Sequence, residues 1–161
     1  MIDRKLILVT REGWFLLSDG EFTEISAWPK LNGPHLVVTD CDEAPVGVHR
    51  FEGKLAYAGA LVEKHARTEG LTEGSTHIVL HRVAQVARGG VALFTAVPLD
   101  LWQHPQQWAA KQDDHCMLVV LVGLLDNGLS GGQARILHLG STIHIAGLNE
   151  GGLFYAGVTV I

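Results

Sequence analysis

Cysteine is scarce in this sequence, and its placement excludes several kinds of site. The 161 residues include two cysteines, Cys41 and Cys116, and neither belongs to a CxxC pair. A disulfide framework or a cysteine-based zinc site needs more cysteines at closer spacing. The sequence therefore predicts a reducing compartment, with Cys116 as a small buried residue.

Clusters of positive charge and long apolar runs are missing too. The formal net charge is -5 and no block of lysines or arginines occurs, which excludes a nucleic-acid footprint and a basic membrane-surface patch. The longest apolar run, residues 116–125, has ten residues, about half of what a helix needs to cross a bilayer. The opening MIDRKLILVT shows no secretory leader pattern. We expect no nucleic-acid partner and no membrane span in this chain.

Familiar catalytic motifs are absent as well. No G-x-S-x-G elbow, P-loop or G-x-G-x-x-G follows a predicted strand. His115 and Cys116 are neighbours on a predicted strand, so their side chains point to opposite faces and cannot share a proton. We therefore predict no catalytic residue from these patterns.

The nine histidines invite a metal interpretation. His138 and His144 lie on strands that flank one turn, and either ring could be a ligand. His77 and His81 are expected on one face of a strand. No spacing indicates a third ligand for either pair, so we predict no metal site, and exposed or hydrogen-bonded histidines are the simpler interpretation.

Apolar periodicity is what the sequence does contain, since 47% of the residues are hydrophobic, enough for a core. Meanders of short strands are predicted at residues 5–25 and 134–161, with tight Gly-containing turns. Between them, residues 54–69 have helical spacing, and 76–98 predict a strand hairpin. This order predicts an α/β fold with a mixed sheet, in which the opening meander has the helix packed on one face.

Three further segments are predicted in the middle of the chain. Residues 41–53, CDEAPVGVHRFEG, are interpreted as a loop. Asp100 could cap a helix in which Pro105 falls in the first turn or divides the helix in two. HCMLVVLV, residues 115–122, is typical of a central strand buried on both faces.

The closing meander carries a resemblance to a known family. A strand, Gly140-Ser141-Thr142, a second strand, Asn149-Glu150-Gly151-Gly152 and a third strand resemble the second phosphate hairpin of the actin-like ATPases, which have the ribonuclease-H-like fold. Residues 93–125 are similar to the strand, helix, strand and short helix that precede this hairpin in pilus assembly proteins of the PilM type and in the cytoplasmic part of GspL-type secretion proteins. Residues 5–25 would then be the first hairpin.

The resemblance implies two units. Residues 1–133 would form a first ribonuclease-H-like subdomain, and residues 134–161 would form the opening antiparallel meander of a second one. Actin-like proteins continue past the second hairpin with further helices and strands. The second subdomain is therefore expected to be truncated, and a piece of a longer protein is the simple explanation.

In that family the hairpins hold the phosphates of ATP through backbone N–H groups, and an acidic residue on each first strand positions the metal ion or water. Gly140, Ser141 and Thr142 would be a vestigial phosphate hairpin here. The acidic position of that hairpin holds His138, and residues 9–13, VTREG, replace the aspartate and Gly-rich turn of the first one. Mg²⁺ prefers oxygen ligands, and phosphoryl transfer depends on it. We expect no cofactor, or at most weak ATP binding.

The resemblance implies a non-catalytic scaffold or assembly component of a bacterial type IV pilus or type II secretion system. It would dock proteins, such as the cytoplasmic tail of an inner-membrane protein, in the cytoplasm at the inner membrane. One alternative is a nucleotide-binding actin-like ATPase whose metal carboxylates lie in the missing remainder. Another is a small enzyme with a histidine-based site.

Tryptophans are the candidate partner-binding residues. Trp102 and Trp108 lie in one amphipathic stretch, where they either pack a helix onto the sheet or present an anchor to a partner. Trp14 and Trp28 could be core or surface residues.

Overall fold

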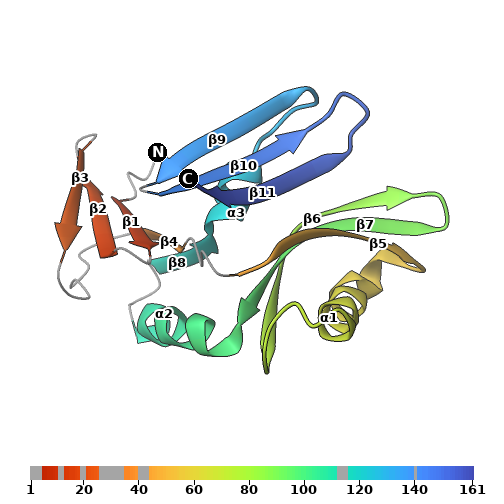
Figure 1. The fold of residues 1–161 in the computed structure, drawn as a ribbon, viewed down its shortest axis with the longest axis horizontal. Helices are drawn as coiled ribbons and strands as arrows, with labels where there is room; N and C mark the ends of the chain where they lie inside the picture. The colour runs from red at the N-terminus through yellow and green to blue at the C-terminus, as the bar shows by residue number, and fades with distance from the viewer. Residues whose placement is uncertain are drawn as a thin grey trace.

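The structure, a computed structural model, describes residues 5–10, 13–18, 21–25, 35–39, 44–111, 116–139 and 141–161. Within these ranges the chain forms three β-sheets and three α-helices (Figure 1). The prediction of a mixed helix and sheet protein is confirmed at that level, with sheet predominating.

The first sheet has the strand order β3-β2-β1-β4-β8. Its strands are β1 (Lys5–Thr10), β2 (Gly13–Ser18), β3 (Glu21–Ile25), β4 (His35–Thr39) and β8 (Cys116–Val120). The first three strands form an antiparallel meander, whereas β1 pairs with β4, and β4 with β8, in parallel. The predicted opening meander and its mixed sheet are therefore confirmed.

Among the described strands β8 lies at the edge of this sheet, so the expectation of a central strand over residues 115–122 is wrong; residue 115 lies outside the described residues. The strand ends at Val120, and the apolar sequence continues as helix α3 (Leu121–Asp126). Both Leu121 and Val122 are buried. A short apolar run does not distinguish a strand from a buried helix, and here it contributes to both.

The second sheet has the order β5-β7-β6. Its strands are β5 (Val46–Glu52), β6 (Thr76–Val86) and β7 (Gly89–Pro98), all antiparallel. The predicted hairpin over residues 76–98 is confirmed. The interpretation of residues 41–53 as a loop is wrong for Val46–Glu52, which pair with β7 along their whole length; residues 41–43 lie outside the described part of the chain.

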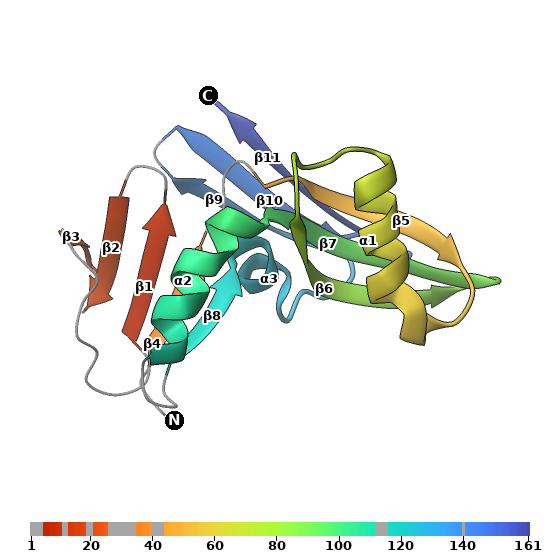
Figure 2. The same cartoon turned by 90° about the horizontal axis from the view of Figure 1, so that it is seen from below.

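Strand β7 is buried on both faces, so the second sheet is the middle layer of the fold. Its residues 91–97 are all buried. Val91 and Leu93 belong to a core that reaches the third sheet, whereas Ala92 and Phe94 belong to a core under a helix. Since side chains alternate along a strand, the second sheet is sandwiched between these two layers (Figure 1, Figure 2).

The predicted helix at 54–69 is confirmed as a 3-10 turn, η1 (Leu55–Tyr57), followed by α1 (Ala58–Thr68). It places Ala58, Val62 and Ala66 against the second sheet. The expectation that it packs on the meander's sheet is therefore wrong. The helix follows β5 after a short connection and returns directly to β6, so it covers the sheet that these strands form.

Helix α2 (Leu99–Lys111) contains Pro105 without being divided. Both expectations for this proline, in the first turn or at a break, are wrong. Asp100 lies inside the first turn, where a carboxylate favours the positive end of the helix dipole. Pro105 itself is buried.

The third sheet contains β9 (Gln133–Leu139), β10 (Thr142–Leu148) and β11 (Phe154–Val160), in the order β11-β10-β9. All neighbours are antiparallel, as the closing meander predicted. Ala146, Leu148 and Phe154 share a hydrophobic core with α3 and β7. The division into subdomains at residue 133 stays a prediction.

Candidate functional site

The third sheet has one buried face and one face open to solvent. Thr142, His144, Ala146 and Leu148 of β10 are buried on the side of α3. Because side chains alternate, Ile143, Ile145 and the residues paired with them lie on the opposite side. We call this side the outer face and define it by the nine positions Ala134, Ile136, His138, Ile143, Ile145, Gly147, Tyr155, Gly157 and Thr159.

The outer face is arranged in three rows that cross β9, β10 and β11. The first row is Ala134, Gly147 and Tyr155, the second is Ile136, Ile145 and Gly157, and the third is His138, Ile143 and Thr159. Ile136 is 68% exposed and Tyr155 44% exposed. Large side chains on an open sheet face are typical of a binding surface.

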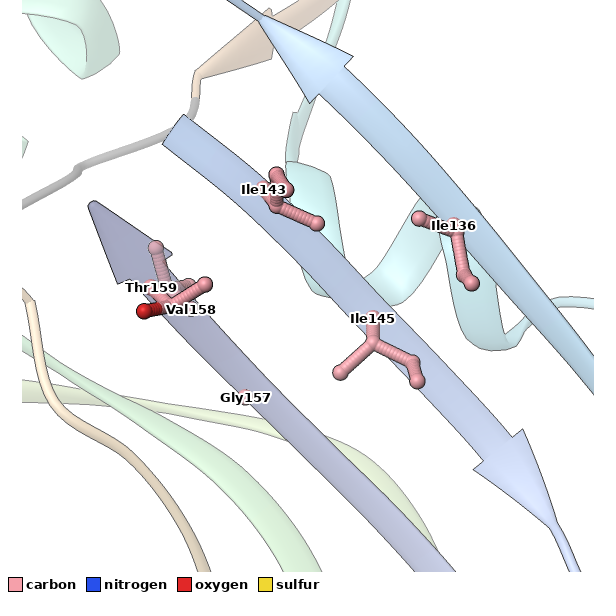
Figure 3. A pocket seen from close by; sticks show the side chains of 6 residues that line it. All are labelled: Ile136, Ile143, Ile145, Gly157, Val158 and Thr159. Carbon is pink, nitrogen blue, oxygen red and sulfur yellow. The ribbon is translucent and has the colours of Figure 1, made fainter. Parts of the chain in front are cut away.

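A shallow hollow of about 340 Å³ lies beside Gly157, lined by Ile136, Ile143, Ile145, Gly157, Val158 and Thr159 (Figure 3). Gly157 has no side chain, so the row that starts with Ile136 ends in a gap. A Cβ placed on Gly157 would lie 3.8 Å from Cγ2 of Ile145, which is an ordinary contact. The gap can therefore accept a small apolar group.

The nine positions of the outer face contain no aspartate, glutamate, lysine or arginine, although the chain has a net charge of -5. An uncharged and partly apolar surface loses little hydration energy when a protein covers it. The surface is therefore suited to contact another protein, and a charged ligand would find no counter-charge on it.

The structure describes two of the three residues of the predicted phosphate hairpin, Ser141 and Thr142. Gly140 lies outside the described residues. The hydroxyl of Thr142 lies 3.2 Å from Nε2 of the buried His144, on the inner side of the sheet. The carbonyl oxygen of Ser141 accepts a hydrogen bond from the N–H of Ile161 at 2.8 Å. Two of the three predicted residues thus make contacts within the protein, and nucleotide binding stays a prediction.

The two histidine pairs are not arranged as ligand pairs. His138 is exposed on the outer face, whereas His144 is buried on the other face. His77 stacks on Trp102 with ring centroids 4.5 Å apart, and His81 lies at a break in the strand register. Among the described residues no group of three or more His, Cys, Asp or Glu side chains is placed to hold a metal ion.

His81 has a structural environment of its own. Its Nε2 lies 2.7 Å from the hydroxyl of Thr95, and α3 passes over it at Gly123, where an added Cβ would come within 3.0 Å of Nδ1. Burial lowers the pKa of His81 from 6.5 to about 4, and the carboxylate of Asp126 opposes this shift. The ring is therefore neutral at pH 7 and holds β6, β7 and α3 together.

The tryptophans make contacts within the molecule. Trp102 is 9% exposed and belongs to a core cluster with Ala44, Val97 and Val120. Its indole Nε1 is buried and has no hydrogen-bond partner among the described residues. Trp108 is half-buried and meets Trp14 edge to face at 6.2 Å. These side chains pack α2 against the sheets, and a partner-binding role for Trp102 or Trp108 stays a prediction. Trp28 lies outside the described residues.

The outer face was not predicted from the sequence. Its residues match no catalytic motif, and single exposed apolar residues are common on protein surfaces. One signal was present in TIHIAGL, where Ile143 and Ile145 are apolar on one face and Ala146 and Leu148 on the other. A strand that is apolar on both faces predicts cover on both sides, and the structure covers one of them.

Comparison with known proteins finds a similar fold. The sequence matches no protein-family model and no curated protein at a significant level. The structure is similar to that of the cytoplasmic domain of EpsL, an inner membrane component of the type II secretion system of Vibrio cholerae, with a TM-score of 0.57. The two sequences are 10% identical, and the match covers 95% of this chain and 70% of the EpsL chain.

The likeness to EpsL, a GspL protein, confirms the GspL part of the resemblance at the level of the fold. The likeness to PilM-type proteins, and the finer actin-like and ribonuclease-H-like assignment, stay predictions. In the described part of the chain no helix is both long and apolar enough to cross a membrane.

Proposed function

We propose that this chain is a non-catalytic assembly component of a bacterial type II secretion or type IV pilus system, and that it docks proteins through the outer face. The outer face carries this proposal, since it exposes Ile136 and Tyr155 beside an apolar hollow and holds no acidic or basic residue. The fold shared with the EpsL domain supports the type of machine. In the proposal the chain works in the cytoplasm at the inner membrane, as an actin-like scaffold.

Docking through the outer face predicts covalent capture of a protein from that position. A photo-reactive amino acid in place of Ile136, in the full-length protein in its native cells, is expected to give crosslinked adducts on irradiation. The matched control places the same amino acid at Glu63 of α1, whose side chain is also exposed. If position 136 gives no more adduct than position 63, docking at the outer face is wrong.

A non-catalytic role predicts that ATP is not hydrolysed. In the resemblance to the actin-like ATPases, His138 takes the position of the metal-positioning carboxylate, and the Thr142 hydroxyl lies on the inner side of the sheet. Titration calorimetry with Mg-ATP is expected to give no binding tighter than roughly millimolar, and phosphate release is expected to stay at background. Micromolar binding that is lost on replacing Ser141 and Thr142 with alanine would favour the ATPase alternative.

A further inference from the structure

In two rows of the outer face, a large side chain at one edge of the sheet is matched by a small one at the other edge. The second row begins with the exposed Ile136 on β9 and ends with Gly157 on β11. The first row has the opposite order, with Ala134 on β9 and Tyr155 on β11. Large and small side chains therefore lie at opposite ends of these rows.

A two-fold rotation about an axis parallel to β10 brings these opposite ends together. Such an axis places β9 of one copy over β11 of the other and keeps each row in place. Ile136 then faces the gap at Gly157 of the second copy, and Ala134 faces Tyr155. We propose that the outer face binds a second copy of this chain in this arrangement, an inference that rests on the proposed docking function.

The residues nearest the axis are compatible with this arrangement. Ile143 and Ile145 of the two copies meet in the middle, where aliphatic side chains can interdigitate between sheets about 10 Å apart. The ring of Tyr155 lies across Gly147, and the facing glycines leave room for two such rings. In the third row His138 faces Thr159, so an imidazole meets a hydroxyl that can donate or accept a hydrogen bond.

The alternative two-fold axis, in the plane of the sheet but across the strands, fits less well. It places β9 over β9 and β11 over β11, so Ile136 faces itself and Gly157 faces itself. The first contact is crowded and the second leaves a void, and both weaken packing. The axis along β10 is the one that pairs large with small residues.

Electrostatics does not oppose contact between two copies at the outer face. Two copies of a chain with a net charge of -5 repel each other. The nine outer-face positions contain no acidic side chain, so contact there brings no carboxylates together. A closed contact between identical surfaces also agrees with the two-fold symmetry of most homodimers.

The size of the sheet predicts a weak dimer. Three strands spaced about 4.8 Å apart, with about 3.3 Å per residue over seven residues, cover on the order of 300 Å² per copy. The total lies well below the roughly 1,200 Å² of stable interfaces, so a transient complex is expected. We expect a dissociation constant on the order of 100 µM.

Sedimentation equilibrium of the purified chain, from roughly 10 µM to 1 mM, tests the proposal. The wild type is expected to shift from monomer to dimer over this range. Ile136→Glu is expected to weaken dimerisation at least tenfold, because it brings a carboxylate into the apolar hollow. Leu101→Glu, at an exposed leucine of α2, is the matched control and is expected to leave the dimer unchanged. Circular dichroism checks that both variants are folded.

A size exchange tests the symmetry axis. Ile136→Ala removes the projecting side chain, and Gly157→Val fills the gap that receives it. Each is expected to weaken the dimer severalfold. The double variant restores one large and one small residue in the row and is expected to recover most of the affinity. A role in folding alone would give no such recovery.

Three results would overturn the second-copy proposal. One is a dimer that persists in Ile136→Glu, and another is a double variant no better than its worse parent. The third is a wild type that stays monomeric up to 1 mM while position 136 crosslinks to a different protein in cells; in that case docking at the outer face stands. A monomeric chain with no crosslink at position 136 would contradict both proposals.

Discussion

Replacing Phe94 with alanine is expected to lower the free energy of unfolding by about 4 kcal/mol. The ring is 1% exposed and belongs to the core between the second sheet and α1. It fills the space above Gly47, where an added Cβ would lie 2.8 Å from Cζ, and it meets His65 edge to face at 6.2 Å. Because β5 and α1 both pack against this ring of β7, the cavity left by the ring cannot easily collapse.

Urea unfolding of Phe94→Ala against Tyr57→Ala measures this effect. Tyr57 is 59% exposed, so the same loss of an aromatic ring is expected to cost less than about 1 kcal/mol there. Equal losses for the two variants would show that the second sheet and α1 do not pack around Phe94 as described.

Replacing Arg82 with alanine is expected to lower the free energy of unfolding by about 3 kcal/mol. Nε of Arg82 donates to Oδ2 of Asp126 at 3.0 Å, and Nη2 donates to the Asp126 carbonyl at 3.3 Å. The Asp126 side chain is 6% exposed, and in the described part of the chain its Oδ1 has no hydrogen-bond partner. Without the guanidinium a buried carboxylate would lose its counter-charge, and α3 would lose its link to β6.

Arg67→Ala is the matched control. Arg67 pairs with Glu63 at the same 3.0 Å distance, but both side chains are exposed on α1, so its loss is expected to cost about 0.3 kcal/mol. The double variant Arg82→Ala with Asp126→Ala is expected to recover part of the loss, since no charge is then left buried. A loss no larger than that of Arg67→Ala would contradict the buried ion pair.

Strands and helices with a regular apolar periodicity could be predicted from the local sequence. The meanders at 5–25 and 134–161 and the hairpin at 76–98 follow from alternating apolar residues between tight turns. The turn of this hairpin lies at the predicted Arg88-Gly89-Gly90, where Arg88 has a φ of 68° and Gly89 begins β7. The helix at 54–69 follows from its apolar spacing. These features depend on neighbours a few residues away, so the sequence by itself determined them.

The assignments that failed depended on distant partners. Residues 46–52 form a strand because they pair with β7, which is distant in the sequence. Within the run at 115–122, the described residues 116–120 form an edge strand and the chain then continues as α3, because α3 packs on the inner face of the third sheet. Pro105 stays within one helix because α2 packs it into a buried position. No local pattern contains this information.

The candidate site was decided by the tertiary structure alone. The sequence predicts that the isoleucines of β9 and β10 lie on strands. It does not say which face of the sheet packs against the core. Helix α3 and β7 cover the face with His144 and Ala146, which leaves Ile136, Ile143 and Ile145 on the outer face. The sequence determined which side chains share a face, because alternation is local. Only packing between distant segments determined which face is buried, because burial depends on what the rest of the chain brings against it.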